Sequence, residues 1–241
     1  MRVALRFAVI SIAALGAAMA FAQQAPAPSA APPAAAPPVE YKPPVRGAPK
    51  VRVGGSTRSA ARELSLAVVA PDHTGLASTD QPELFWYVSQ AVKTPLEFTL
   101  IAGDAIDPLV EKALPPVGEA GIQRIRLADL GVKLKPGDEY QWSISFVADA
   151  TSRSKDTVAS GRVRVAAVPA ELASQVADAG PTRSYAVYAG AGYWYDALAM
   201  LRRQIAERPK DAALLAAQQS LLEQVGLTEV ARYERERAAG R

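Results

Sequence analysis

Alternating apolar and polar residues constrain the fold of this chain more than any other feature of its sequence. The clearest case is EYQWSISFV at 139–147, in which Tyr140, Trp142, Ile144 and Phe146 alternate with polar side chains. A period of two places all four on one face of a β-strand. The segment therefore predicts a strand with one buried face.

Further segments between residues 63 and 168 show the same pattern, and turn-forming residues separate them. They are ELSLAVVA (63–70), ELFWYV (83–88), LEFTLIA (96–102), IQRIRLA (122–128), GRVRVAAV (161–168) and a weaker one at 108–114. Pro, Gly and Asp recur between them, in PDHTG, AGD, PPVG and KPGD. Short strands at this spacing predict an antiparallel β-sandwich over residues 60–168.

The motif LKPGDEYQW at 134–142 makes this prediction more specific. It resembles the start of the penultimate strand of fibronectin type III domains, where a Leu, a Pro-Gly turn and a Tyr form a tyrosine corner. There the ring packs in the core while the hydroxyl bonds a backbone group of the preceding turn. Trp86 on an early strand fits a buried indole in such a core. We expect a fibronectin-III-like or immunoglobulin-like sandwich.

From residue 169 the spacing of apolar residues becomes helical. PAELASQVADAG (169–180) predicts a short helix, and apolar residues after Trp194 and after Leu214 predict two more. We expect a small helical subdomain at 169–230. The charged tail at 231–241 contains few apolar residues and is expected to fray.

These helices need something to pack against. The run from Gly192 to Pro209 resembles the second helix of a tetratricopeptide repeat, but stacked repeats need about three or more units for stability. The strand ELFWYV offers a surface, because Phe85 and Tyr87 point opposite to Trp86 and make both of its faces apolar. We expect the helices to cover the outer face of that strand.

The N-terminus predicts export. Arg2 and Arg6 precede an apolar run at 7–18, and the sequence AFA ends at Ala22. A basic start, an apolar run of this length and small residues around a cleavage site are typical of a signal peptide. We expect residues 1–22 to be removed near Ala22, which places the protein in the periplasm or outside the cell. The alternative is an uncleaved membrane anchor; after cleavage we expect no transmembrane segment.

Two low-complexity segments follow. Residues 23–40, QQAPAPSAAPPAAAPPVE, predict a disordered or semi-rigid linker of polyproline type, with a Pro-rich ligand as the alternative. Residues 41–59 form a basic Pro/Gly stalk without an acidic side chain. Its candidate partner-binding residues are Arg46, Lys50, Arg52 and Arg58. The stalk either lies across the sandwich, with its arginines paired to acids, or binds phosphate groups of anionic lipid.

Composition excludes several chemistries. Without residues 1–22 the chain has 25 cationic and 24 anionic side chains, so we expect no nucleic-acid partner. It has no Cys and one His, which excludes thiol catalysis, disulfides and an ordinary zinc site. His73 lies in the turn PDHTG, where we expect it exposed and diverging from Asp72. We predict no catalytic, cofactor-binding or metal-binding residues, and therefore no enzyme.

The order of several short motifs carries a family resemblance. They are YKPPVRGAP (41–49), GGSTR (54–58), FWY (85–87), YQW (140–142), RSKD (153–156), WYD (194–196) and LL with VGL (221–227). Together they resemble a bacterial exported family known as domain of unknown function 928. One departure is Ala148-Asp149, where many relatives have Cys-Asp, so no redox or disulfide role carries over. The resemblance implies an envelope or secreted protein and no established activity.

The function expected from these observations is an exported, soluble, non-enzymatic binding or scaffolding module of the cell envelope. Its expected partner is another envelope protein. Two alternatives stay open. The first is a carbohydrate-binding module or a two-carboxylate glycan hydrolase, and sugar binding would be favoured if two of the side chains of Trp86, Trp142 and Trp194 lie exposed on one face. An anionic-lipid binder would use Arg46 and its neighbours in the stalk.

Overall fold

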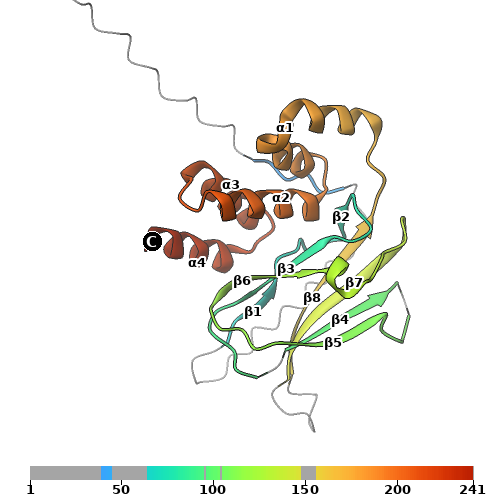
Figure 1. Ribbon diagram of the computed structural model, residues 1–241, viewed down its shortest axis with the longest axis vertical. Helices are drawn as coiled ribbons and strands as arrows, with labels where there is room; N and C mark the ends of the chain where they lie inside the picture. The colour runs from blue at the N-terminus through green and yellow to red at the C-terminus, as the bar shows by residue number, and fades with distance from the viewer. Residues whose placement is uncertain (1–38, 45–63, 95, 104, 148–155, 241) are drawn as a thin grey trace, which may run out of the picture. The chain divides into compact units, whose positions relative to one another are not determined.

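The computed structural model describes residues 39–44, 64–94, 96–103, 105–147 and 156–240 (Figure 1). The expected signal peptide and nearly all of the expected linker lie outside these residues. So do the candidate stalk residues Arg46, Lys50, Arg52 and Arg58, together with Ala148-Asp149.

Five strands form the larger sheet, in the order β2-β8-β7-β4-β5. Their bounds are β2 Gly75–Ala77, β4 Leu96–Ala102, β5 Val110–Leu114, β7 Glu139–Phe146 and β8 Thr157–Val165. The pairs β8-β7, β7-β4 and β4-β5 are antiparallel, while β2 runs parallel to β8.

Three strands form the smaller sheet, in the order β1-β3-β6. They are β1 Leu66–Val68, β3 Glu83–Val88 and β6 Gly121–Arg126, and a 3-10 turn, η1 Leu127–Leu130, follows. Both pairs in this sheet are antiparallel. The segments predicted by alternation, and the weaker one at 108–114, are thus confirmed as strands.

The sequence prediction missed β2, and a wholly antiparallel body was wrong. The turn PDHTG leads into this strand of three residues, which is too short to show an alternating pattern. Gly75 starts β2 because only a glycine leaves room there. A Cβ on it would lie 2.9 Å from Cε2 of Tyr195.

The two sheets pack against one another around a shared core. Leu96, Phe98 and Leu100 of β4 alternate toward the interior and are wholly buried. They approach closely at Gly161 in β8, where a Cβ would lie 3.0 Å from Cβ of Ala70, two residues after β1. This contact sets β1 opposite β8 and requires a glycine between them.

The tyrosine corner expected before β7 is present. Tyr140 is buried, with 3% of its surface exposed, and its hydroxyl accepts a hydrogen bond from the N–H of Lys135 at 2.9 Å. Gly137 has φ of 88° in the intervening turn, a conformation that favours glycine. The sequence motif therefore fixes the local geometry at which the chain enters β7.

Helices follow the sheets: α1 Ala170–Gly190, α2 Trp194–Glu207, α3 Ala212–Gln224 and α4 Thr228–Ala239. As expected, the first helical stretch of α1 ends at Gly180, whose φ of 66° and ψ of 176° are not helical. A second stretch of α1, which the sequence prediction did not include, starts at Pro181. The two helices expected after Trp194 and after Leu214 are confirmed as α2 and α3.

The expectation that residues 231–241 fray was wrong, because they belong largely to α4. Val230 and Ala231 are buried, and the ring of Tyr233 packs edge-on against Tyr87 of β3, with centroids 5.3 Å apart. Few apolar residues suffice for this helix, since it buries only one narrow face. The contact confirms that the helices cover the outer face of β3.

Replacing Tyr140 by Phe tests the tyrosine corner. The change keeps the ring and removes the acceptor of the Lys135 N–H, so we expect the free energy of unfolding to fall by about 1 kcal/mol. Urea denaturation measures it. Tyr188→Phe is the matched control, because the Tyr188 hydroxyl has no hydrogen-bond partner in the described part of the chain. Equal loss in both variants would contradict the assignment.

Candidate functional site

The first turn of α2 inserts into the sheets and positions the helices. Trp194 is wholly buried, and its Nε1–H donates to the carbonyl oxygen of Val69 at 3.0 Å. The next residue, Tyr195, donates its hydroxyl proton to the carbonyl oxygen of Arg162 at 2.9 Å. The same hydroxyl accepts from Nε1–H of Trp142 at 2.9 Å. These bonds join α2 to β7, β8 and the chain after β1.

A third residue completes this anchor, which we call the WYD anchor (residues 194–196). The carboxylate of Asp196 accepts from the backbone N–H of Ser78 at 2.8 Å and from the Ser78 hydroxyl. Burial raises the pKa of Asp196, while the two bonds from Ser78 oppose that shift. Burial also raises the pKa of Tyr195, so its hydroxyl keeps its proton.

The chain before the sheets is also attached to the helices. Residues 39–44 lie along them, with the N–H of Tyr41 bonded to Oε1 of Gln224 at 2.7 Å and that of Lys42 to the carbonyl of Ala189 at 3.1 Å. Val39, placed in the linker by its sequence context, is 5% exposed. Gly192 allows the approach, since a Cβ there would lie 3.0 Å from the Lys42 carbonyl oxygen.

His73 does not lie free in its turn, which corrects the sequence prediction. Its Nδ1 is 3.2 Å from Oδ1 of Asp72, and its Nε2 is 2.8 Å from the hydroxyl of Tyr41, whose ring stacks on it. The prediction failed because Tyr41 is distant in sequence. The order Asp-His-hydroxyl is that of a catalytic triad, but the Tyr41 side chain is buried, with 7% of its surface exposed, and burial raises the pKa of its phenol. The cluster therefore anchors the N-terminal segment.

The indoles do not form a sugar-binding platform. Trp142 and Trp194 are wholly buried, and Trp86 has 3% of its surface exposed. Stacking on a sugar needs an accessible aromatic face, so these three side chains act as core.

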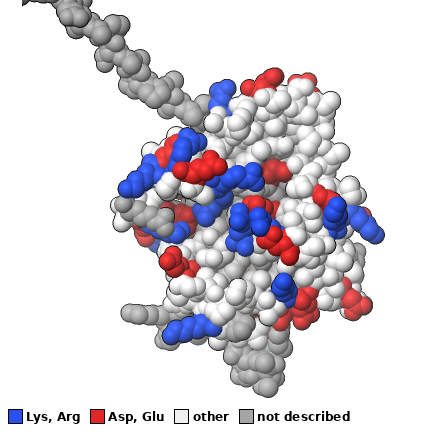
Figure 2. Space-filling model, viewed as in Figure 1, with Lys and Arg blue, Asp and Glu red and all other residues white. Residues whose placement is uncertain are grey.

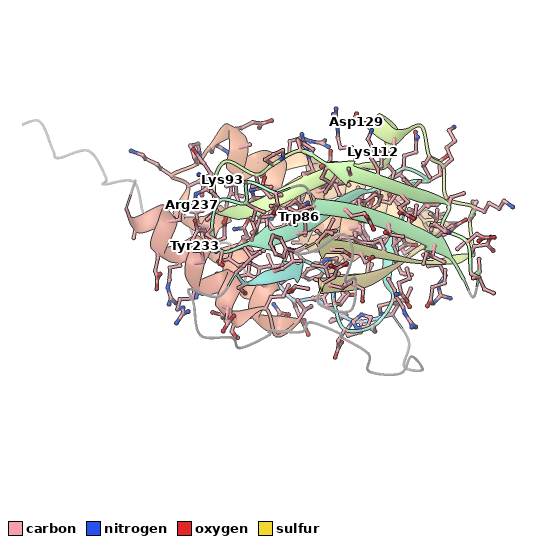
Figure 3. The ribbon with its side chains drawn as sticks, turned by 90° about the horizontal axis from the view of Figure 1, so that it is seen from below. Trp86, Lys93, Lys112, Asp129, Tyr233 and Arg237 are labelled. Carbon is pink, nitrogen blue, oxygen red and sulfur yellow. The ribbon has the colours of Figure 1, made fainter. Side chains whose placement is uncertain are left out.

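A cleft of about 410 Å³ lies beside β6, which we call the β6 cleft. Its walls come from three parts of the chain: the loop at 114–120, strands β3 and β6, and helices α2 and α4. The strands contribute Trp86, Ile122, Gln123, Arg124 and Ile125, and the helices contribute Arg202 and Arg237. Figure 3 shows Trp86 within the sheets and Arg237 on the neighbouring helix.

Most of the charged side chains that line the β6 cleft are positive. Arg124, Arg202 and Arg237 line it together with one carboxylate, that of Glu119. On the face seen in Figure 2, Lys and Arg side chains gather where the helices meet the sheets, with acids beside them. Arg124 has Oε1 of Glu83 3.5 Å from its Nη1, yet half of its side chain stays exposed.

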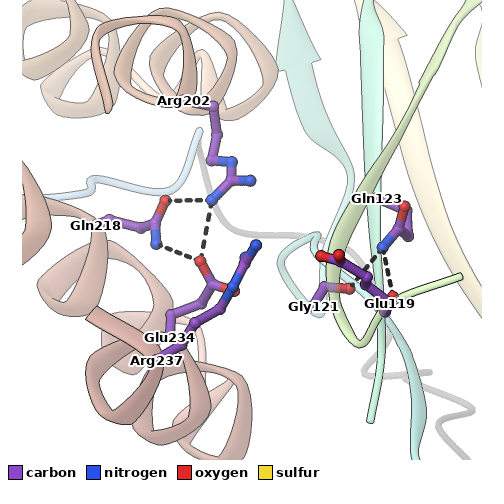
Figure 4. A network of polar contacts seen from close by, with 7 residues as sticks. All are labelled: Glu119, Gly121, Gln123, Arg202, Gln218, Glu234 and Arg237. Carbon is purple, nitrogen blue, oxygen red and sulfur yellow. Dashed lines mark hydrogen bonds and ion pairs between the residues drawn. The ribbon is translucent and has the colours of Figure 1, made fainter. Parts of the chain in front are cut away.

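Glu234 of α4 holds the two helical arginines in place (Figure 4). Its Oε2 is 3.1 Å from Nη1 of Arg202, and its Oε1 is 3.6 Å from Nη1 of Arg237. The Gln218 amide bridges Arg202 and Glu234 with bonds of 3.1 and 3.3 Å. Burial lowers the pKa of Arg202, although Glu234 opposes the shift. The guanidinium groups are therefore held in fixed positions rather than on mobile side chains.

Two buried polar atoms near this cleft make no hydrogen bond in the described part of the chain, although one of them, Oε1 of Glu234, has its ion pair with Arg237. Within the described residues, Nε1 of Trp86 and Oε1 of Glu234 are buried and make no hydrogen bond. A buried donor without an acceptor costs about 1–3 kcal/mol. The N–H of the buried Trp86 indole is therefore a hydrogen-bond donor that has no acceptor within the described residues.

Little in the amino-acid sequence indicated this site. Arg124 belongs to an alternating strand, whereas Arg202 and Arg237 lie on exposed-looking helix positions, and no spacing relates the three. The described residues hold no group of three or more His, Asp or Glu side chains suited to a metal ion. In the same residues, no helix combines the length and apolar character that crossing a membrane requires.

In the described residues the fold is mixed α/β, with two sheets and four α-helices. Residues 52–234 match the family described as Domain of Unknown Function (DUF928), and the chain belongs to this family. The match confirms the resemblance drawn from the short motifs. No curated protein matches the chain.

Titration of Asp196 gives a test of the WYD anchor. A raised pKa in the folded state stabilises the fold at low pH, and this contribution is lost as pH rises from the ordinary value of 3.8 through the raised one. Asp196→Asn abolishes the titration. Its free energy of unfolding, relative to wild type, should therefore improve as pH increases through that window.

Urea denaturation from about pH 3.5 to about pH 7 measures the difference. Asp178→Asn on the exposed side of α1 is the control and should follow wild type. Parallel curves for wild type and Asp196→Asn would contradict the burial of this carboxyl group.

Proposed function

We propose that this chain is an exported, non-catalytic binding module of the cell envelope that contacts another envelope protein through the β6 cleft. The single observation that carries the proposal is the set of three guanidinium groups held around a cleft of ligand size. The signal-peptide pattern at residues 1–22 supports export.

The chemistry of the cleft favours recognition over catalysis. A guanidinium group stays protonated at neutral pH, so arginines bind anions but do not serve as general acids or bases. The carboxylate nearest to them, Glu234, is engaged by Arg202 and Arg237. A planar guanidinium pairs well with a carboxylate, and acidic side chains of a protein partner supply that group.

The strand order supports a fibronectin-III-like body for this module. A three-stranded sheet, β1-β3-β6, faces β5-β4-β7-β8, and Tyr140 forms a tyrosine corner before β7. Bodies of this type commonly serve as rigid carriers of binding surfaces. The parallel strand β2 is an addition beside the helices.

Site-specific photocrosslinking in intact cells tests the proposal. Gly118 suits a photoreactive residue, because it lines the cleft and a Cβ there would have no atom within 4 Å. We expect light to produce an adduct with one envelope protein, on a chain that begins at Gln23. Adding Arg124→Glu and Arg237→Glu should lower its yield about tenfold.

The matched control places the same photoreactive residue at Ala177, which is exposed on α1, away from the cleft. Equal adducts from both positions, or none from Gly118, would overturn the assignment of the cleft. A chain that retains residues 1–22 in the cytoplasm would overturn export.

A further inference from the structure

We propose that the partner adds an extended segment to the free edge of β6, with acidic and apolar side chains in alternation. This inference rests on the proposed function and names the chemistry of the partner. It draws on the edge of the smaller sheet, the uncovered strand of the larger sheet and the charge beside them.

The first observation is the edge itself. In the described residues β6 pairs with β3 alone, at the end of the order β1-β3-β6. Along such a strand, every second residue points its N–H and C=O away from the sheet. The Gln123 amide donates to the carbonyls of Glu119 and Gly121, at 3.2 and 3.5 Å, which occupies the start of the strand. Residues 122–126 remain as the pairing edge.

The second observation is a vacant strand position. The contact between Ala70 and Gly161 sets β1 opposite β8. Counting across both sheets, β3 then faces β7 and β6 faces β4, so that within the described part of the chain β5 has no strand opposite it. A strand added at β6 would occupy that position.

The inner face of β5 shows what such a strand would cover. Val110, Lys112 and Leu114 pair with the wholly buried residues of β4 at positions 100, 98 and 96, and so point toward the smaller sheet. Yet Val110 and Leu114 are only half-buried, and Lys112 is exposed. Apolar side chains on the inner face of the added strand would bury both apolar residues.

The charge of neighbouring residues determines which side chains fit on the other face of the added strand. Arg124 lies opposite Phe85 in the register with β3, on the side of β6 that faces the helices. Arg237 reaches the same side, with its Nη1 3.1 Å from where a Cβ on Gly121 would lie. Side chains of an added strand that point toward the helices would meet these guanidiniums, so acidic residues fit there.

A synthetic peptide of alternating Glu and Val, labelled with fluorescein, tests this inference by fluorescence polarisation on the chain from residue 23 to 241. We expect it to bind, and a peptide of alternating Lys and Val to bind at least about tenfold more weakly. Arg124→Glu should weaken the Glu-Val peptide similarly. Arg203→Glu, an exposed position on α2 outside the cleft lining, should leave binding unchanged.

N-methylation of the peptide distinguishes strand pairing from charge attraction alone, and it leaves the protein untouched. Methyl groups on alternate amides block one edge of the peptide, so one of the two methylation patterns should abolish binding and the other should preserve it. Equal binding of both, or of the Glu and Lys peptides, would overturn strand addition.

The two proposals fail separately. If Gly118 crosslinks a partner in cells while no Glu-Val peptide binds, strand addition is wrong and the binding cleft stands. If Gly118 yields no adduct while the peptide binds through one edge, the edge is real and the envelope partner is wrong.

Discussion

The structure depends on the insertion of three successive side chains, those of Trp194, Tyr195 and Asp196, between the helices and the sheets. Each makes a hydrogen bond to the sheet body within 2.8–3.0 Å, and two of them are fully or almost fully buried. Buried polar groups are costly when unpaired, so these bonds favour one position of α2 over all others.

The position of α2 in turn creates the β6 cleft. Strands β3 and β6 and the loop at 114–120 form part of its lining, and α2 and α4 form the rest; neither part alone holds the three arginines. Glu234 then sets the distance between Arg202 and Arg237, while the Tyr87–Tyr233 contact keeps α4 on the outer face of the smaller sheet. The geometry of the β6 cleft therefore depends on the WYD anchor.

Sequence reasoning found the elements whose signals are local. Alternation located β3, β4 and β7, and the Pro-Gly turn before Tyr140 predicted a specific hydrogen bond. Sequence reasoning could not predict β2, because this strand is held by pairing with β8, which is distant in sequence. For the same reason it could not predict the hydrogen bond between Tyr41 and His73. The cleft was missed for the same reason, because Arg124, Arg202 and Arg237 meet only after the helices fold back on the sheets. The stalk residues proposed instead lie outside the described residues.

The most direct test of this account is urea denaturation of the Tyr195→Phe variant, followed by far-ultraviolet circular dichroism and by tryptophan fluorescence. The variant leaves the Trp142 N–H and the Arg162 carbonyl without their partner. The account predicts one coincident transition for helices and sheets, with the free energy of unfolding lowered by about 2–4 kcal/mol. An unchanged midpoint, or helices that unfold apart from the sheets in the wild type, would contradict it.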